Sequence, residues 1–334
     1  MPERGGPIAT HHIDSLSAPL LVSWQLTRDC DLCCVHCCTE SAPGKALPDE
    51  LDAAGAHRLA AELIRSEVPY VMLCGGEPLV VPHFFAIAER LGHAGVQLKI
   101  ESNGQRLDEA AARRLAALPV RSVQVSLDAD TPEVYARQRA GGSLAKAQAA
   151  CRAVRDAGMP LEVTFAPTRL NIHQGRAVVD RARSLGAFRF NTGALMRIGT
   201  AARRWAQLEP DAEQYRAFLA LLREQARLRQ DEMELYYEPF LMEDALRASL
   251  DQPPATLLVL PNGRVKVAAA LAYTCADLRV QTLAQAWESY RRAWRSDTII
   301  HAARRALAES SSYAEANRWL PLDSPEIPEI VEGR

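Results

Sequence analysis

The 334-residue sequence lacks the features that mark membrane, secreted and nucleic-acid-binding proteins. No run of 18 consecutive apolar residues occurs, so a membrane-spanning helix is not expected. The opening stretch, MPERGGPIATHHIDS, has no apolar core of the kind found in secretory signals. Lys and Arg number 39 against 41 Asp and Glu, a balance that gives no support for a nucleic-acid or anionic-membrane partner. We expect a cytoplasmic protein with neither kind of partner.

Predicted strands and helices alternate over roughly the first two thirds of the chain. Apolar runs predict strands at 20–26, 69–74, 96–101, 121–127, 160–166 and 187–192. Amphipathic segments predict helices at 50–66, 81–93, 107–117 and 173–185, and helical segments broken at Gly141-Gly142 over 131–156. Such alternation implies parallel strands joined by right-handed crossovers. It fits an α/β fold with a partial (β/α)6 barrel, and an open doubly wound sheet fits the same pattern.

The pattern changes after about residue 205, where an α+β region is predicted. Helices are predicted at 210–230, 282–295 and 298–309, and short strands at 234–238, 256–260 and 264–268. Pro261-Asn262-Gly263 reads as the turn of a hairpin between the last two strands. The predicted parts of the chain are an N-terminal segment (1–17), a barrel (18–205), a C-terminal region (206–318) and a surface or partly disordered tail (319–334).

Five of the eight cysteines lie close together, in the segment Cys30-Asp-Leu-Cys33-Cys34-Val-His36-Cys37-Cys38. Disulfide scaffolds spread their cysteines along a short secreted chain, so this crowding indicates metal binding. Cys30, Cys34 and Cys37 have the spacing CxxxCxxC. Three thiolates on one loop can bind three irons of a [4Fe-4S] cluster and leave the fourth iron open to a ligand that is not protein.

Zinc is the alternative metal for this segment. Cys30 with Cys33, and Cys34 with Cys37, form two CxxC pairs. The pairs abut, whereas structural zinc sites separate their pairs with a loop. Cys33 and Cys38 are surplus to a three-cysteine site, and we expect them to pack near it or to support it.

Three polar turns follow predicted strands. They are Gly75-Gly76-Glu77-Pro78, Ser102-Asn103-Gly104 and Ser126-Leu127-Asp128. Each has a purely structural alternative, because the first two are common strand–helix turns and Asp128 can cap the next helix. In a parallel barrel, however, the carboxyl ends of the strands form the edge that holds ligands.

The cysteine segment and these turns, taken in this order, resemble the radical S-adenosylmethionine (radical SAM) superfamily over about residues 18–200. The resemblance implies a partial barrel and a [4Fe-4S] cluster on Cys30, Cys34 and Cys37 whose open iron binds SAM. It also implies a flavodoxin or ferredoxin that supplies one electron. SAM then yields a 5′-deoxyadenosyl radical, which abstracts hydrogen from the substrate.

The same resemblance implies which residues bind SAM. In the family the loop Gly75-Gly76-Glu77-Pro78 holds the methionine part, and the carboxylate of Glu77 can accept from the ammonium. Histidine before the third cysteine packs on adenine or supports the cluster sulfurs. The remaining candidates are His36 at the adenine, Ser102 and Asn103 in the second turn, Ser126 and Asp128 at the ribose, and Arg197 at the SAM carboxylate.

The C-terminal region resembles the twitch extension of the SPASM/twitch branch, which includes enzymes of quinone-cofactor, tetrapyrrole and peptide modification. The hairpin at 260–265 carries this likeness. In that branch a cysteine follows the hairpin, at the position that Ala268 occupies here. Cys275 is the one cysteine nearby, and one cysteine cannot hold an auxiliary [4Fe-4S] cluster. We therefore expect a twitch-like region without an auxiliary cluster.

Cys275 has three interpretations: a small buried apolar residue, a hydrogen-atom donor to a substrate radical, or a remnant iron ligand. Only 29 residues precede Cys30, which leaves no room for the leader-recognition domain of many peptide-modifying members. The predicted substrate is therefore a small polar metabolite, for example a sugar-containing natural product that undergoes epimerisation, elimination or decarboxylation. Modification of a tetrapyrrole or peptide is the alternative. A non-catalytic iron–sulfur or zinc protein is a third hypothesis.

Overall fold

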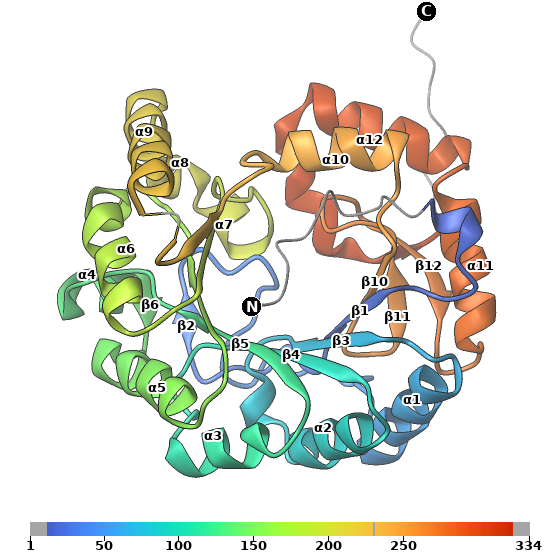
Figure 1. Cartoon of the computed structure of the whole chain (residues 1–334). Coiled ribbons are helices and arrows are strands. Elements are labelled where there is room, and N and C mark those ends of the chain that lie inside the picture. Colours follow the sequence, from blue (N-terminus) through green and yellow to red (C-terminus); the bar gives the residue numbers. More distant parts are fainter. Residues whose placement is uncertain (1–11, 230, 323–334) are drawn as a thin grey trace, which may run out of the picture.

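The computed structural model describes residues 12–229 and 231–322, and its main feature is one curved eleven-stranded sheet with helices along its outer side (Figure 1). The strands are Leu21–Gln25 (β1), Tyr70–Cys74 (β3), Gln97–Ser102 (β4), Val120–Ser126 (β5), Leu161–Phe165 (β7), Arg189–Thr192 (β8), Glu234–Tyr236 (β9), Thr256–Val259 (β10), Arg264–Lys266 (β11), Tyr273–Asp277 (β12) and Leu320–Pro321 (β13). Their order in the sheet is β13-β12-β11-β10-β1-β3-β4-β5-β7-β8-β9.

Strand directions confirm the partial α/β barrel. From β10 to β9 every neighbouring pair is parallel, whereas β11 is antiparallel to both β10 and β12. Within the described residues the two edge strands, β13 and β9, do not pair with each other, so the sheet does not close. The six predicted barrel strands are all present, and the C-terminal strands β10 and β9 extend them at both edges.

The helices before residue 185 lie on the outer side of the sheet, and the later ones form two groups, one at the β9 edge and one beside β10 to β12 (Figure 1). They are Ala53–Arg65 (α1), Phe84–His93 (α2), Glu109–Ala116 (α3), Pro132–Gln138 (α4), Leu144–Asp156 (α5), Gly175–Ser184 (α6), Gly199–Arg203 (α7), Trp205–Leu208 (α8), Ala212–Arg229 (α9), Met242–Asp251 (α10), Leu283–Ala293 (α11) and Asp297–Ala308 (α12). Short 3₁₀ helices occupy Ile13–Ser15, Pro78–Val80, Ile172–Gln174 and Ser310–Arg318. No helix in the described parts of the chain is both long enough and apolar enough to cross a membrane.

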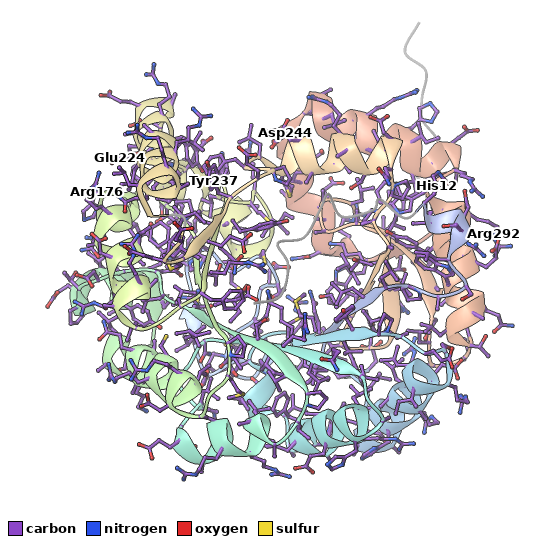
Figure 2. All side chains as sticks on the ribbon, in the orientation of Figure 1. His12, Arg176, Glu224, Tyr237, Asp244 and Arg292 are labelled. Atoms are coloured by element: carbon purple, nitrogen blue, oxygen red, sulfur yellow. The ribbon has the colours of Figure 1, made fainter. Side chains whose placement is uncertain are left out.

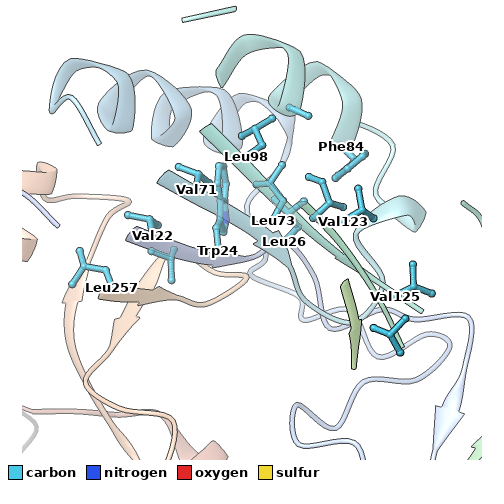
Figure 3. Close-up of a cluster of buried hydrophobic side chains, with 14 of the residues drawn as sticks. Val22, Trp24, Leu26, Val71, Leu73, Phe84, Leu98, Val123, Val125 and Leu257 are labelled. Carbon is cyan, nitrogen blue, oxygen red and sulfur yellow. The ribbon is translucent and has the colours of Figure 1, made fainter. Parts of the chain in front are cut away.

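Residue alternation along the strands separates an apolar outer face from a polar inner face. Leu98 of β4 is fully buried beside Val71 of β3, and Figure 3 shows both in the apolar layer between the strands and a covering helix. Lys99 and Glu101 alternate with these residues and therefore lie on the inner face. Full burial of an aliphatic side chain contributes about 1.5–3 kcal/mol, so the outer layer holds the barrel together and leaves the inner face to polar groups.

Local signals explain where the helices begin. The carboxylate of Asp52 accepts a hydrogen bond from the amide of Gly55 at 2.7 Å, and this cap starts α1 three residues later than the sequence predicted. Such a cap contributes about 1 kcal/mol.

Between helices, the Arg176 guanidinium of α6 lies 2.6 Å from the Glu224 carboxylate of α9, and Figure 2 shows the two side chains together at the rim of the molecule.

Several elements were not predicted. The segment 131–156 divides into α4 and α5 at the predicted break, but Arg139–Ala140 (β6) and Cys33–Cys34 (β2) form an unpredicted pair of antiparallel strands. The predicted domain boundary at residue 205 does not divide the sheet, because β9 and β10 follow this residue and pair with β8 and β1, which precede it. The division into domains therefore stays a prediction. The tail contributes β13 to the sheet. Residues 1–11 of the N-terminal segment and 323–334 of the tail lie outside the described residues.

Candidate active site

The loop that follows β1 carries the cysteine cluster, and residues 26–44 are called the cluster loop below. Cys30, Cys34 and Cys37 all line one cavity of about 390 Å³, the main cavity. Gly75, Gly76, Ser102, Asn103 and Ser126 line the same cavity. The turns after β3, β4 and β5 thus meet the cluster loop at the carboxyl edge of the sheet. Cys33 is exposed and does not line the main cavity.

Each of the three candidate thiols has a hydrogen-bond donor from another residue. Asn103 Nδ2 lies 3.6 Å from the sulfur of Cys30, and Arg139 Nη1 lies 3.7 Å from that of Cys34. The backbone amide of Ser41 donates to the sulfur of Cys37 at 3.3 Å. Donors of this kind stabilise the anionic sulfur of a metal-bound thiolate and help to set a cluster's reduction potential.

The cysteines fit an iron–sulfur cluster better than a single metal ion. In the described residues no three His, Cys, Asp or Glu side chains converge closely enough to hold one ion. Zinc needs all its sulfur ligands about 2.3 Å from one centre, whereas each cysteine of a [4Fe-4S] cluster binds a different iron. Burial raises the pKa of the Cys30 and Cys34 thiols to about 12, so iron must displace their protons.

Close backbone contact explains the two glycines after β3. The amide of Gly76 donates to the carbonyl of Thr27 at 2.7 Å, and the amide of Glu77 donates to that of Asp29 at 3.0 Å. A Cβ on Gly76 would lie 2.0 Å from the Asp29 carbonyl oxygen. Gly75 has φ +142°, and a Cβ there would lie 2.8 Å from the Thr27 oxygen. The glycines therefore bring the turn against the cluster loop as well as to the cavity wall.

Glu77 is fully buried, and its carboxylate binds protein groups. It accepts from the amide of Leu79 at 3.1 Å, the hydroxyl of Ser102 at 3.0 Å and the amide of Asn103 at 2.7 Å. Burial raises its pKa to about 7 although all three donors oppose this change. Glu77 does not line the main cavity, and nor does Pro78, which opens the short 3₁₀ helix. In this structure Glu77 joins the two turns and positions Asn103.

Asp128 is a buried carboxylate that contacts two basic side chains, Arg139 and His36, which lie on different segments. Its Oδ2 accepts from Arg139 Nε at 2.6 Å and lies 3.1 Å from His36 Nε2. Burial alone would raise the pKa of Asp128, but Arg139 and His36 outweigh it and hold the pKa at about 2. Asp128 does not line the main cavity, so it orients His36 and Arg139 from behind the cavity wall.

His36 lines the main cavity and has one nitrogen without a partner. Its Nε2 faces Asp128, while its buried Nδ1 has no hydrogen-bond partner among the described residues. Unpaired buried polar atoms are rare in folded proteins and commonly mark a place that a ligand completes. This observation fits a polar molecule such as SAM in the cavity, beside the three thiols.

Arg197, which follows the sixth barrel strand, and Cys275 of β12 do not line the main cavity. Leu195 and Met196 line the main cavity, but Arg197 does not, and its guanidinium stacks 5.4 Å from the ring of Trp205. Cys275 is also absent from the cavity wall, and its thiol faces the carbonyl of Val265 at 3.6 Å. Burial raises the pKa of this thiol to about 12. Its role as a hydrogen-atom donor stays a prediction.

Sequence reasoning missed the polar inner face of the sheet. Lys99 Nζ donates to Glu162 at 2.9 Å, and Asn191 Nδ2 donates to the same carboxylate at 2.7 Å. Gln124 Nε2 donates to Glu101 at 3.1 Å, and both of these residues line the main cavity. Burial raises the pKa of Glu101. The alternation of polar and apolar residues in β4, β5 and β7 was the signal that could have shown this face.

Arg139 was missed as well. It contacts both Asp128 and the sulfur of Cys34, yet it lies in a segment predicted as a helix interrupted by glycines. The two-residue strand β6 that holds it is too short to leave a pattern in the sequence.

A larger hollow of about 690 Å³ lies elsewhere, between α3 and α5, and no cysteine lines it.

Residues 24–172 match the model of the Radical SAM superfamily. Mycofactocin maturase MftC of Mycobacterium ulcerans is 36% identical over 205 residues, which cover 60% of this chain and 53% of that protein. The AdoMet-dependent heme synthase of Methanosarcina barkeri is 29% identical over 55% of this chain and 52% of its own length. The PqqA peptide cyclase of Ruegeria pomeroyi is 29% identical over 69% of this chain and 61% of its own length. The chain thus spans about half the length of the first two relatives.

Solved structures agree on the fold. SuiB of Streptococcus suis, in its crystal structure bound to the precursor peptide SuiA, superposes with a TM-score of 0.66 at 15% identity. The match covers 86% of this chain and 67% of that one. At this identity the likeness extends to the fold, a partial barrel with a C-terminal region beside it. The matched family has a [4Fe-4S] cluster and SAM as cofactors, and the three thiols and the cavity above fit both. On these grounds the chain is similar to the radical SAM superfamily over residues 24–172, which make up most of the barrel.

Proposed function

We propose that the protein is a radical SAM enzyme that modifies a peptide. The observation that carries this proposal is the convergence of Cys30, Cys34 and Cys37 on one cavity, each with its own donor to sulfur. When bound, the cluster and SAM supply a 5′-deoxyadenosyl radical that takes a hydrogen atom from the substrate. The protein's own residues bind and orient the substrate and keep water out of the site.

The chain's residues have separable tasks in this scheme. Cys30, Cys34 and Cys37 hold the cluster, and Asn103 and Arg139 donate to two of the sulfurs. Gly75, Gly76, Ser102 and Ser126 form the cavity wall at which SAM binds. Fixed donors in a buried site act without reorganisation when charge moves, so this rigid wall favours electron transfer into the site.

A peptide is preferred to the two other substrates considered. The relatives named above include a peptide cyclase and a heme synthase, which favours the predicted alternative, a peptide or tetrapyrrole, over a sugar-like metabolite. The peptide cyclase also aligns over more of this chain, 69% against 55%.

A reduced compartment and a low-potential electron donor belong to the same proposal. All eight cysteines are free thiols, as expected for a chain that works in the reducing cytoplasm. A flavodoxin or ferredoxin is the class of protein that supplies single electrons there.

The test compares two neighbouring cysteines. The protein is reconstituted anaerobically with iron and sulfide, then given SAM and dithionite, and 5′-deoxyadenosine is measured. Cys34→Ala is expected to lose the cluster and the product, whereas Cys33→Ala, which alters the exposed neighbour, is expected to keep both. Zinc in place of iron, or an intact cluster that yields no 5′-deoxyadenosine, would favour a non-catalytic metal protein and overturn the proposal.

A further inference from the structure

A second, smaller cavity opens beside the main cavity, between the cluster loop and the C-terminal strands. Its volume is about 100 Å³, and it is called the side pocket here. Gln25, Cys38, Thr39 and Met196 line both spaces, so the two adjoin. A substrate whose reacting carbon lies in the main cavity can therefore extend a few further atoms into the side pocket.

A buried lysine forms part of the wall of the side pocket. Lys266 of β11 is 5% exposed, and its ammonium donates to the carbonyl of Ala269 at 2.8 Å. No salt bridge joins it to any carboxylate of the described residues. Burial lowers its pKa to about 8, with the Cys38 thiol opposing this, so the ammonium remains mostly charged at neutral pH. An ammonium has three protons to donate, and one carbonyl satisfies only one of them.

A second donor lines the same pocket from a different part of the chain. Trp319 is 9% exposed, and its buried indole Nε1 has no hydrogen-bond partner among the described residues. Its backbone is left-handed, with φ 52°, which is uncommon for a bulky residue and is held here by the start of β13. The Arg28 guanidinium lies over the indole ring, 5.4 Å from its centroid.

The rest of the pocket is largely apolar, with Ile198, Leu258 and Leu260 in its wall. An unpaired cation and an unpaired N–H group in such surroundings carry a desolvation cost that an anionic acceptor removes. A carboxylate is an acceptor that suits both kinds of donor, since it is anionic and has two oxygens that accept hydrogen bonds.

We propose that the side pocket binds a carboxylate of the substrate, with Lys266 and Trp319 as the donors. This inference rests on the proposed function, because it takes the main cavity as the place of hydrogen abstraction. The carboxylate of a peptide belongs either to its C-terminus or to an acidic side chain. The pocket chemistry is the same for both, and the probes below separate them.

The chief alternative is that Lys266 only ties the hairpin to Ala269. In that case the lysine holds residues 266–269 together, and the nature of the ligand is irrelevant to it. A conservative replacement separates the two roles. Lys266→Arg keeps a charge that can bind a carboxylate, and Lys266→Met keeps a long apolar side chain without one.

The experiment is calorimetric titration of the reconstituted, SAM-loaded enzyme with three capped dipeptides. The probes are N-acetyl-Ala-Leu with a free C-terminal carboxylate, the same dipeptide as its amide, and N-acetyl-Asp-Leu amide, whose carboxylate is in the side chain. One acid is expected to bind at least tenfold more tightly than the amide, and which acid it is identifies the source. The chain has four lysines, Lys45, Lys99, Lys146 and Lys266, and the exposed Lys146 provides the control.

Lys266→Met is expected to abolish the preference for the acid, Trp319→Phe to weaken it, and Lys266→Arg and Lys146→Met to retain it. Circular dichroism and iron content show whether each variant folds and loads. Equal binding of acids and amide by the wild type, no acid binding at millimolar concentration, or a preference that survives Lys266→Met would each overturn the inference. Formation of 5′-deoxyadenosine by the same wild-type sample tests the proposed function separately, so the two can fail independently.

Discussion

Replacing Asp128 with asparagine tests how much this buried carboxylate stabilises the fold. Its oxygens accept from Arg139 Nε at 2.6 Å and from the amide of Ala166 at 2.7 Å, and His36 Nε2 lies 3.1 Å away. Asparagine keeps the size but removes the charge, which leaves the buried Arg139 unpaired. Breaking a buried ion pair in this way costs about 3–5 kcal/mol. The fall in pKa from 3.8 to about 2 gives a similar size, ~2.5 kcal/mol at about 1.36 kcal/mol per pH unit.

The direction of the pH effect follows from the same pKa. The folded-state pKa of Asp128 lies below its ordinary value, so the stabilisation is present above about pH 4. It is lost as the pH falls from about 4 toward 2. Over this range the unfolded chain binds a proton at Asp128 while the folded protein does not, so acid favours unfolding. The difference between wild type and Asp128→Asn should therefore be full at pH 7 and shrink on acidification.

Urea unfolding of the metal-free protein measures this, with Asp130→Asn as the matched control. Asp130 pairs with Arg181 at 2.8 Å, but both side chains are partly exposed. Such surface pairs contribute about 0–1 kcal/mol. A loss for Asp128→Asn no larger than that for Asp130→Asn would refute the argument that Asp128 carries a buried charge pair. So would a loss that is the same at pH 7 and at pH 3.

Two further changes act on the loops around the main cavity. Gly76→Ala places a Cβ 2.0 Å from the Asp29 carbonyl, so it should cost about 1–3 kcal/mol or more and lower the iron content after reconstitution. Gly158→Ala, which meets nothing within 4 Å and has φ +77°, should cost ~1 kcal/mol and keep the iron; equal iron in both variants would contradict this. Asn103→Ala removes the donor 3.6 Å from the Cys30 sulfur, so an EPR-monitored titration should give a more negative cluster potential at unchanged iron content. An unchanged potential would show that this hydrogen bond has no electronic effect.

The strand–helix pattern was sufficient to predict the parallel sheet, whereas the choice of a partial barrel over an open doubly wound sheet came from the family resemblance. Strands rich in buried aliphatic residues alternate with amphipathic helices, and this pattern leaves parallel strands as the solution. Parallel strands end at one edge, so the turns at Gly75, Ser102 and Ser126 had to meet the loop of Cys30. No side-chain geometry was needed to predict that meeting.

The partners of each polar group could not be predicted in the same way. In this structure the Glu77 carboxylate accepts from Leu79, Ser102 and Asn103, and its predicted contact with SAM stays a prediction. Whether a carboxylate at a strand end faces a ligand or a neighbouring loop depends on backbone positions within an ångström or two. Sequence spacing does not contain that information.

Long-range pairing was also beyond the sequence. Nothing in 256–260 identified β10 as the neighbour of β1, because one short apolar strand pairs as well as another. That pairing brings β11, and with it Lys266, to the cluster loop. The preference for a small polar metabolite rested on the length of chain before Cys30, whereas the relatives include a peptide cyclase and a heme synthase.

The position of β1 in the sheet has a consequence for biosynthesis. Its two neighbours, β3 and β10, pair Leu21 with Tyr70 on one side and with Thr256 on the other. A chain emerging from the ribosome can complete the first pairing early, but it must wait for most of its length before the second can form. Until then β1 presents a bare hydrogen-bonding edge beside Val22 and Trp24, the kind of edge through which chains aggregate. Variants that weaken β10 should therefore reduce the soluble yield in cells before they alter the activity of the folded molecules that remain.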